Sequence, residues 1–249
     1  MITANCREKF TEKDFLFIVD TLADNAKSKQ EALVALLSDP GSLDTILDDD
    51  NLFQKITQSS AFSEISPYLY FYLLTRHVLN EYDVDDRNVA DYVAAMLARF
   101  CSSSRMHGIS SEHQRNYRYL VDMMVDAANA SPREAFLIRS HMGNYSLFIT
   151  GLFPDYVYRQ STYGRKSPGF DYYEQMGRSS FQWASQHRLA LQFSLAEILS
   201  SLSDNFRQIR IALNCLTDQY IRLDEGGSTL DKILRQIFFG SKPSDEPEA

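Results

Sequence analysis

The stretch Ser66-Pro67-Tyr68-Leu69-Tyr70-Phe71-Tyr72-Leu73-Leu74 decides the fold class of this 249-residue chain. Ser66 can cap the free N–H groups at the start of a helix, and Pro67 fits the first helical turn without losing a hydrogen bond. The seven residues that follow are apolar or aromatic on every side, and such a helix must be covered by several neighbours. The stretch therefore predicts a helix at the centre of the fold.

Apolar residues recur at intervals of three and four along most of the chain, which is the period of a helix that buries one face. Ser131-Pro132-Arg133-Glu134 has the pattern of a capping box with Pro at the first helical position. Further helices are expected from about Ser111, from about Phe170, over 187–202 and over 204–223, and a loop is expected over 154–169. No segment alternates apolar and polar residues as a half-buried strand does. We therefore expect an all-α fold, a single compact bundle of about eight to ten helices without a sheet.

Composition limits the class of protein. The chain has 25 Lys and Arg against 33 Asp and Glu, a net charge of −8, and 44% hydrophobic residues. Its aromatic content excludes disorder of the whole chain, and no apolar run approaches the roughly 18 residues that span a bilayer. The N-terminus has no recognisable signal peptide. Cys6, Cys101 and Cys215 match neither a disulfide framework nor a zinc site, so we expect a protein of the reducing cytoplasm.

Domain boundaries are expected only near the ends. Nothing between residues 60 and 240 has the composition of a linker, so residues 1–240 are predicted to form a single helical domain, with 1–60 as a peripheral helical N-terminal region. Residues 241–249 are charged and contain Pro, which predicts a disordered tail.

Residues 133–188 differ from the rest of the chain. They contain seven Arg and Lys against four Asp and Glu, and 12 of the 31 aromatic residues. Such segments can bind nucleic acid, but the negative charge of the whole chain opposes a polyanion. A small anion or an acidic partner remains possible, and Arg165 and Lys166 could hold an anion at the start of the following helix. The alternative is that the aromatic residues form core and the charges are solvated.

A resemblance covers residues 60–200. It rests on His141-Met142-Gly143-Asn144-Tyr145-Ser146-Leu147-Phe148-Ile149-Thr150-Gly151-Leu152-Phe153-Pro154-Asp155 and on Asp171-Tyr172-Tyr173-Glu174-Gln175-Met176-Gly177-Arg178-Ser179-Ser180-Phe181. These residues resemble a pattern in an uncharacterised family of bacterial all-helical proteins, a domain of unknown function. The resemblance implies a bacterial origin and assigns neither an activity nor catalytic residues.

Glycines within these helices predict close contacts between helices. Gly143, Gly151 and Gly177 let a neighbouring element approach the backbone, and such a crossing would bring His141 and Tyr145 near Tyr172 and Tyr173. The cluster could be a polar pocket with an imidazole acid or base, or a buried hydrogen-bonded group that fixes helix register. The candidate pocket or partner contacts are His141, Tyr145, Arg165, Lys166, Asp171, Tyr172 and Tyr173.

Motifs of known catalytic sites are absent from the sequence. No Glu is followed three residues later by His, as a di-iron bundle requires, and no G-x-S-x-G occurs. We expect no metal site, no cofactor and no nucleic acid or membrane partner. The favoured function is an interaction or regulatory module without catalysis, with a protein partner or as a homodimer. The alternative is a protein or enzyme that binds a small, anionic molecule in a pocket near His141 and Tyr172/Tyr173.

Overall fold

The computed structural model describes residues 2–23, 26–58, 64–101, 108–110, 113–116, 120–163 and 168–221. Within these residues the chain forms one 3₁₀ helix, thirteen α-helices and two short strands. They are η1 (Arg7–Lys9), α1 (Glu12–Ala23), α2 (Lys27–Leu37), α3 (Pro40–Leu47), α4 (Asp50–Gln58), α5 (Pro67–Glu81), α6 (Arg87–Phe100), β1 (Gly108–Ser110), β2 (His113–Asn116), α8 (Leu120–Asn129), α9 (Pro132–Leu152), α10 (Pro154–Tyr163), α11 (Phe170–Ser185), α12 (Arg188–Gln192), α13 (Ala196–Asp204) and α14 (Phe206–Gln219). The helical class predicted from the sequence is confirmed.

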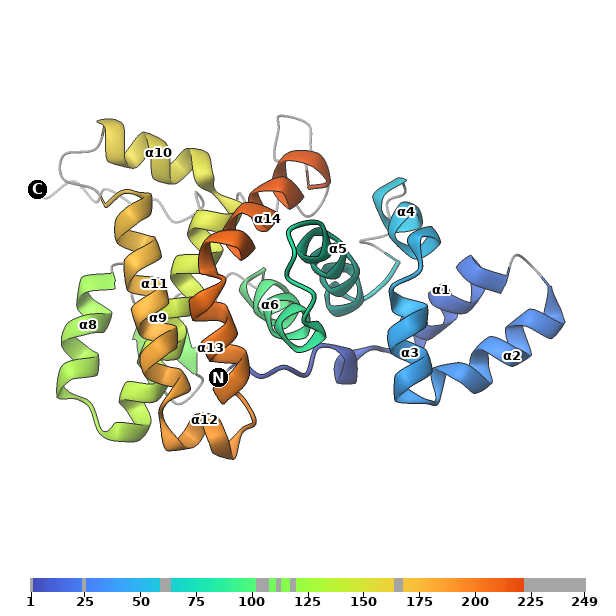
Figure 1. Cartoon of the computed structure of the whole chain (residues 1–249), viewed down its shortest axis with the longest axis horizontal. Helices are drawn as coiled ribbons and strands as arrows, with labels where there is room; N and C mark the ends of the chain where they lie inside the picture. The colour runs from blue at the N-terminus through green and yellow to red at the C-terminus, as the bar shows by residue number, and fades with distance from the viewer. Residues whose placement is uncertain are drawn as a thin grey trace, which may run out of the picture.

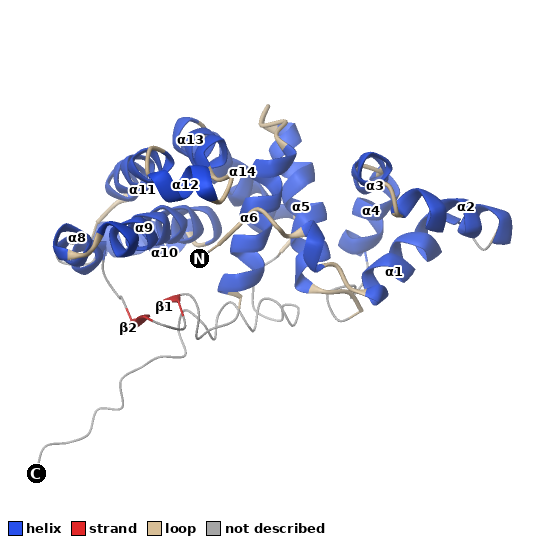
Figure 2. Cartoon of the chain, turned by 90° about the horizontal axis from the view of Figure 1, so that it is seen from below, coloured by secondary structure: helices blue, strands red, loops and turns tan. Residues whose placement is uncertain are grey.

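The helices form three groups along the long axis of the molecule (Figure 1). α5 and α6 lie in the middle, α1 to α4 on one side of them, and α8 to α14 on the other. In the larger group, α9 packs against α8, α11 and α14, and α11 also packs against α13. The view from below shows the same order (Figure 2). None of the described helices combines the length and apolar character that a membrane span requires.

α5 has the central position predicted for it. The Leu69 N–H donates to Ser66 Oγ at 3.2 Å, and Pro67 occupies the first turn. Every residue from Leu69 to Leu74 is buried. The helix packs against α4, α6 and α14, so neighbours cover it on several sides, as a helix without a polar face requires.

Carboxylates tie the N-terminal segment to α5 and α6. Asp91 of α6 is 1% exposed and accepts the N–H groups of Cys6 and Arg7 at 2.8 and 2.9 Å and the Arg7 Nε at 3.0 Å. Asp14 of α1 is fully buried and accepts the Ser66 N–H at 2.7 Å. Buried carboxylates are tolerated only when they are hydrogen-bonded, and these two meet that condition by joining distant parts of the chain.

The prediction of a fold without a sheet is wrong for one short hairpin. β1 and β2 pair in antiparallel fashion, with Gly108 opposite Asn116 and Ser110 opposite His113. A helix was predicted to begin near Ser111, whereas α8 begins at Leu120. The stretch from Gly108 to Asn116 contains one apolar residue, Ile109, so a helix there would have had no apolar face to bury.

Two local differences contribute to a number of helices above the predicted eight to ten. The helix predicted over 187–202 is two helices, because α12 ends at Gln192, α13 begins at Ala196, and Ser194 between them has a positive φ of 54°. The loop predicted over 154–169 contains α10. Pro154 is compatible with the first turn of a helix, and Val157 is 1% exposed, which anchors α10 on the core.

Candidate functional site

Two glycines set how closely α11 approaches α9. A Cβ atom added to Gly143 would lie 2.5 Å from Cε1 of Phe181, and one added to Gly177 would meet the ring of Phe206 and lie 3.0 Å from Cβ of Ser146. Ordinary carbon contacts are about 3.5–4.0 Å, so a larger residue would force the neighbours apart. The close approach predicted from these glycines is confirmed, and it fixes the position of α11 on α9.

All three tyrosines of the predicted site lie in one region of the molecule. Tyr145 belongs to an apolar cluster formed by α8, α9 and α10, and Tyr172 and Tyr173 of α11 pack against this cluster. The rings of Tyr172 and Tyr173 meet edge to face with centroids 5.9 Å apart. Burial, together with the nearby hydroxyls of Tyr156 and Tyr172, raises the pKa of Tyr173 to about 12. Tyr173 is therefore neutral at physiological pH.

His141 lies in the interior beside α6. It is 6% exposed, and its ring meets that of Phe100 edge to face with centroids 5.7 Å apart. One turn further along α9, Asn144 accepts a hydrogen bond of 3.0 Å from the buried hydroxyl of Tyr92, also on α6. α9 thus presents polar groups to α6 through His141 and Asn144, whereas Tyr145 lies in the cluster shared with α8 and α10.

Of the remaining predicted site residues, the structure describes only Asp171. Asp171 is exposed in the first turn of α11 and lines a cavity on the outside of that helix. Arg165 and Lys166 lie outside the described residues. The predicted set is therefore spread over an interior position, a tyrosine cluster and a surface cavity.

An aromatic ladder extends from the core to the surface where α11 ends. The ring of Phe136, which is fully buried on α9, stacks on His187 with centroids 5.1 Å apart. His187 stacks in turn on Trp183 at 5.4 Å, and the guanidinium of Arg139 lies 5.9 Å from the centre of the Trp183 ring. His187 also caps α12, because its Nδ1 accepts the Leu189 N–H at 3.2 Å. These contacts hold Trp183 in one orientation although 40% of it is exposed.

Large apolar side chains are exposed directly after this ladder. Leu191 of α12 is 71% exposed and Phe193, which ends α12, is 45% exposed. α12 lies at the lower edge of the molecule beneath α11 and α13 (Figure 1). We call Arg139, Trp183, His187, Leu191 and Phe193 the end surface. Their exposure makes them candidate contacts for a partner, because contiguous exposed apolar patches are typical of interaction sites.

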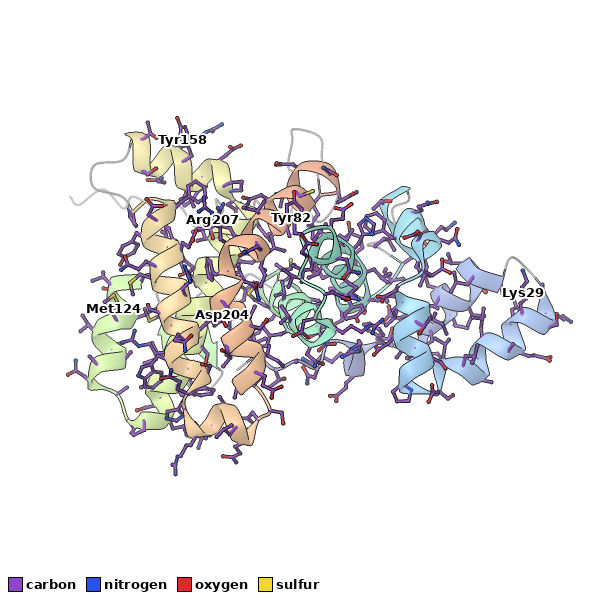
Figure 3. The ribbon with its side chains drawn as sticks, viewed as in Figure 1. Lys29, Tyr82, Met124, Tyr158, Asp204 and Arg207 are labelled. Carbon is purple, nitrogen blue, oxygen red and sulfur yellow. The ribbon has the colours of Figure 1, made fainter. Side chains whose placement is uncertain are left out.

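The cavity on α11 is the second candidate. It is a depression that is largely open to solvent, with a volume of about 350 Å³, and it is lined by Asp171, Glu174, Gln175, Arg178 and Ser179, which share one face of the helix. α13 and α14 pack against α11. Figure 3 labels Asp204, the last residue of α13, and Arg207, in the first turn of α14. The lining therefore offers two carboxylates, an amide, a guanidinium and a hydroxyl to a ligand.

The sequence contains weak signals for the end surface and for the cavity on α11. Trp183 is the sole tryptophan of the chain, and it lies four residues before His187, a spacing that brings side chains together at the end of a helix. The exposure of Leu191 and Phe193 had no local signal, because it depends on which face of α12 is covered. The face of α11 that lines the cavity follows helical spacing from Asp171 to Ser179, but helical spacing does not predict a cavity.

Neither a metal site nor a similar protein assigns a function to these residues. Over the residues that the structure describes, no three His, Cys, Asp or Glu side chains gather in a way that could hold a metal ion. Comparison with protein-family models, curated proteins and solved structures gave no match. The resemblance to a bacterial helical family therefore stays a prediction.

Proposed function

We propose that this protein is an interaction module without catalysis of its own, and that the end surface binds a protein partner. The observation that supports this most strongly is the combination of an ordered, exposed Trp183 with the exposed Leu191 and Phe193, which follow it within ten residues of the chain. Tryptophan and arginine dominate the binding energy of many interfaces, and an anchor that is already rigid loses little entropy on binding.

The charges around the end surface indicate the chemistry of the partner. Arg139 lies over Trp183, and Arg188 is exposed in the first turn of α12. Both belong to the basic, aromatic segment of an otherwise acidic chain. The partner that fits is a protein segment with apolar side chains flanked by carboxylates, since opposite charges at the rim favour encounter and orientation.

Localisation and origin are part of the same proposal. Cys6, Cys101 and Cys215 are free thiols, which supports a reducing cytoplasm. The resemblance of residues 60–200 supports a bacterial source.

A matched set of variants tests the proposal. The double variant Leu191→Ser/Phe193→Ser removes the exposed apolar groups, and Leu16→Ser, which changes a residue 55% exposed on α1, is its control. A partner recovered with the wild type and with Leu16→Ser should bind the double variant at least about tenfold more weakly. Because Trp183 is the sole tryptophan, its fluorescence should change when the purified partner binds. Equal binding by all three proteins would refute the proposal.

Self-association is measured separately. Light scattering over a range of concentrations would show whether the end surface joins two copies of the chain. A dimer that persists in the wild type and dissociates in the double variant would identify the partner as a second copy. A dimer unaffected by the double variant would be formed elsewhere.

A further inference from the structure

The cavity on α11 has a wall with charges of both signs in a fixed order along the helix. Asp171 and Glu174 lie toward its start, Arg178 toward its end, and the polar Gln175 and Ser179 line it as well. At a rise of about 1.5 Å per residue, Glu174 and Arg178 are roughly 6 Å apart along the axis, and Asp171 and Arg178 roughly 10 Å. A ligand in this cavity therefore meets negative charge at one end and positive charge at the other.

Arg178 is held in position by the neighbouring helix. Its Nε donates to the carbonyl oxygen of Ser203 at 3.2 Å, and the Ser203 hydroxyl donates back to the Arg178 carbonyl at 3.0 Å. Ser203 is 4% exposed. This reciprocal pair uses one N–H of the guanidinium and leaves the terminal nitrogens for a ligand carboxylate, the group that arginine binds best.

The two carboxylates differ in how far they are neutralised. Glu174 Oε2 lies 3.9 Å from Nε of Arg210, which is 14% exposed and lies over the ring of Phe170. Burial lowers the pKa of Arg210, Glu174 opposes this, and the nearby charge of Arg207 adds to it. The positively charged Arg210 therefore lies next to the Glu174 carboxylate. Asp171 makes no hydrogen bond or ion pair with any residue in the described part of the chain, and it is exposed.

We propose that this cavity binds a small zwitterion of dipeptide size, with its ammonium group at Asp171 and Glu174 and its carboxylate at Arg178. The lining residues Asp171, Glu174 and Arg178 carry a net charge of −1, which Arg210 beside Glu174 compensates, so a molecule without net charge but with both ionic groups matches them. An extended dipeptide spans at most about 7 Å. This length lies between the roughly 6 Å from Glu174 to Arg178 and the roughly 10 Å from Asp171 to Arg178 along the axis of α11. The cavity is largely open to solvent along one face of α11, and its volume of about 350 Å³ is large enough for a molecule of this size.

Other classes of ligand fit this wall less well. An anion without an ammonium group, such as a phosphate, would bring its charge against two carboxylates. A cation without a carboxylate would meet Arg178 and the positive charge of Arg210. Charges of like sign at short distance disfavour binding, so both classes should bind more weakly than the zwitterion.

Calorimetric titration of the full chain with alanyl-alanine tests the proposal. Two blocked forms serve as probes of the ionic groups, namely the N-acetylated dipeptide and the dipeptide amide. We expect saturable binding of alanyl-alanine below about 10 mM, and at least about tenfold weaker binding of each blocked form, because each has lost one charge-assisted contact. Absence of saturable binding, or equal affinity for all three molecules, would overturn the proposal.

Variants connect the binding to the cavity. Asp171→Asn changes an exposed residue without partners in the described part of the chain, so it should fold normally and bind alanyl-alanine about two- to fivefold more weakly. Glu174→Gln should have a similar effect. The control is Asp122→Asn, an exposed carboxylate on α8, and it should leave the affinity unchanged. Binding that survives both α11 variants would locate the dipeptide elsewhere. The end surface is not involved, so Leu191→Ser/Phe193→Ser should bind alanyl-alanine like the wild type.

Discussion

Replacing Gly143 with alanine tests the contact that places α11 on α9. The added Cβ would lie 2.5, 2.6 and 2.8 Å from three ring atoms of Phe181. To reach an ordinary separation of about 3.5 Å, the ring would have to move by roughly 1 Å. Phe181 is fully buried and packs against Phe206 with centroids 6.2 Å apart, so the ring has little room to move.

The expected loss of stability follows from two opposing effects. Overpacking of a dense core costs about 1–3 kcal/mol, and we take the upper half of this range because the ring is enclosed. Alanine in place of glycine within a helix favours folding by about 1 kcal/mol. The net prediction is that Gly143→Ala lowers the free energy of unfolding by about 1–2 kcal/mol.

Gly41→Ala is the matched control. A Cβ at Gly41, in the first turn of α3, would lie 3.5 Å from Oδ2 of Asp39, which is an ordinary contact. This variant should raise the free energy of unfolding by about 0.4–1 kcal/mol, through the reduced freedom of the unfolded chain. Opposite signs for the two glycines would separate a steric effect from a general effect of alanine.

Urea unfolding followed by circular dichroism provides the measurement. A double-mutant cycle with Phe181→Leu adds a direct test, because a smaller side chain leaves space for the new methyl group. The double variant should be more stable than the sum of the single effects predicts, by at least about 0.5 kcal/mol. A Gly143→Ala protein as stable as the wild type, or strictly additive effects, would refute the close contact between Gly143 and Phe181.

Three further predictions concern ionisable side chains. Asp91→Asn should lower the free energy of unfolding by about 2–3 kcal/mol in urea titrations, because a buried carboxylate with three N–H donors loses its charge. For Asp48, burial opposes ionisation, but the hydrogen bonds from Arg76 and Arg87 outweigh it and keep the pKa below its usual value. Its ionised form therefore stabilises the fold above about pH 4, and the stability difference between wild type and Asp48→Asn should disappear as pH falls below that value. Burial raises the pKa of the Cys101 thiol, so this partly exposed residue should react with a thiol reagent at pH 8 more slowly in the folded state than after denaturation, and equal rates would contradict its placement.

Local signals predicted the helix starts well. Ser131 Oγ accepts the Glu134 N–H, and the Glu134 carboxylate accepts the Ser131 N–H at 3.1 Å, so the predicted capping box is complete. Such bonds form within one turn of the chain, and three or four neighbouring residues specify them. The hairpin at Gly108–Asn116 was missed because the helical pattern was extended through a stretch with a single apolar residue.

The arrangement of the candidate site depended on contacts that the sequence pattern does not contain. Sixteen of the 21 residues of α9 are buried, so periodicity does not show which face meets α6 and which meets α11. This is why the sequence pattern does not show that the His141 imidazole lies beside Phe100 of α6.

The sequence by itself determined the helical class, the central position of Ser66–Leu74, and the need for close packing at Gly143 and Gly177. Those properties follow from hydrogen bonds within a turn, from the period of the apolar residues and from the size of single side chains. Only the tertiary structure decided that Arg210 lies beside Glu174 and that the face of α12 with Leu191 is uncovered. These depend on how distant helices pack against one another, and that packing is a property of the whole core.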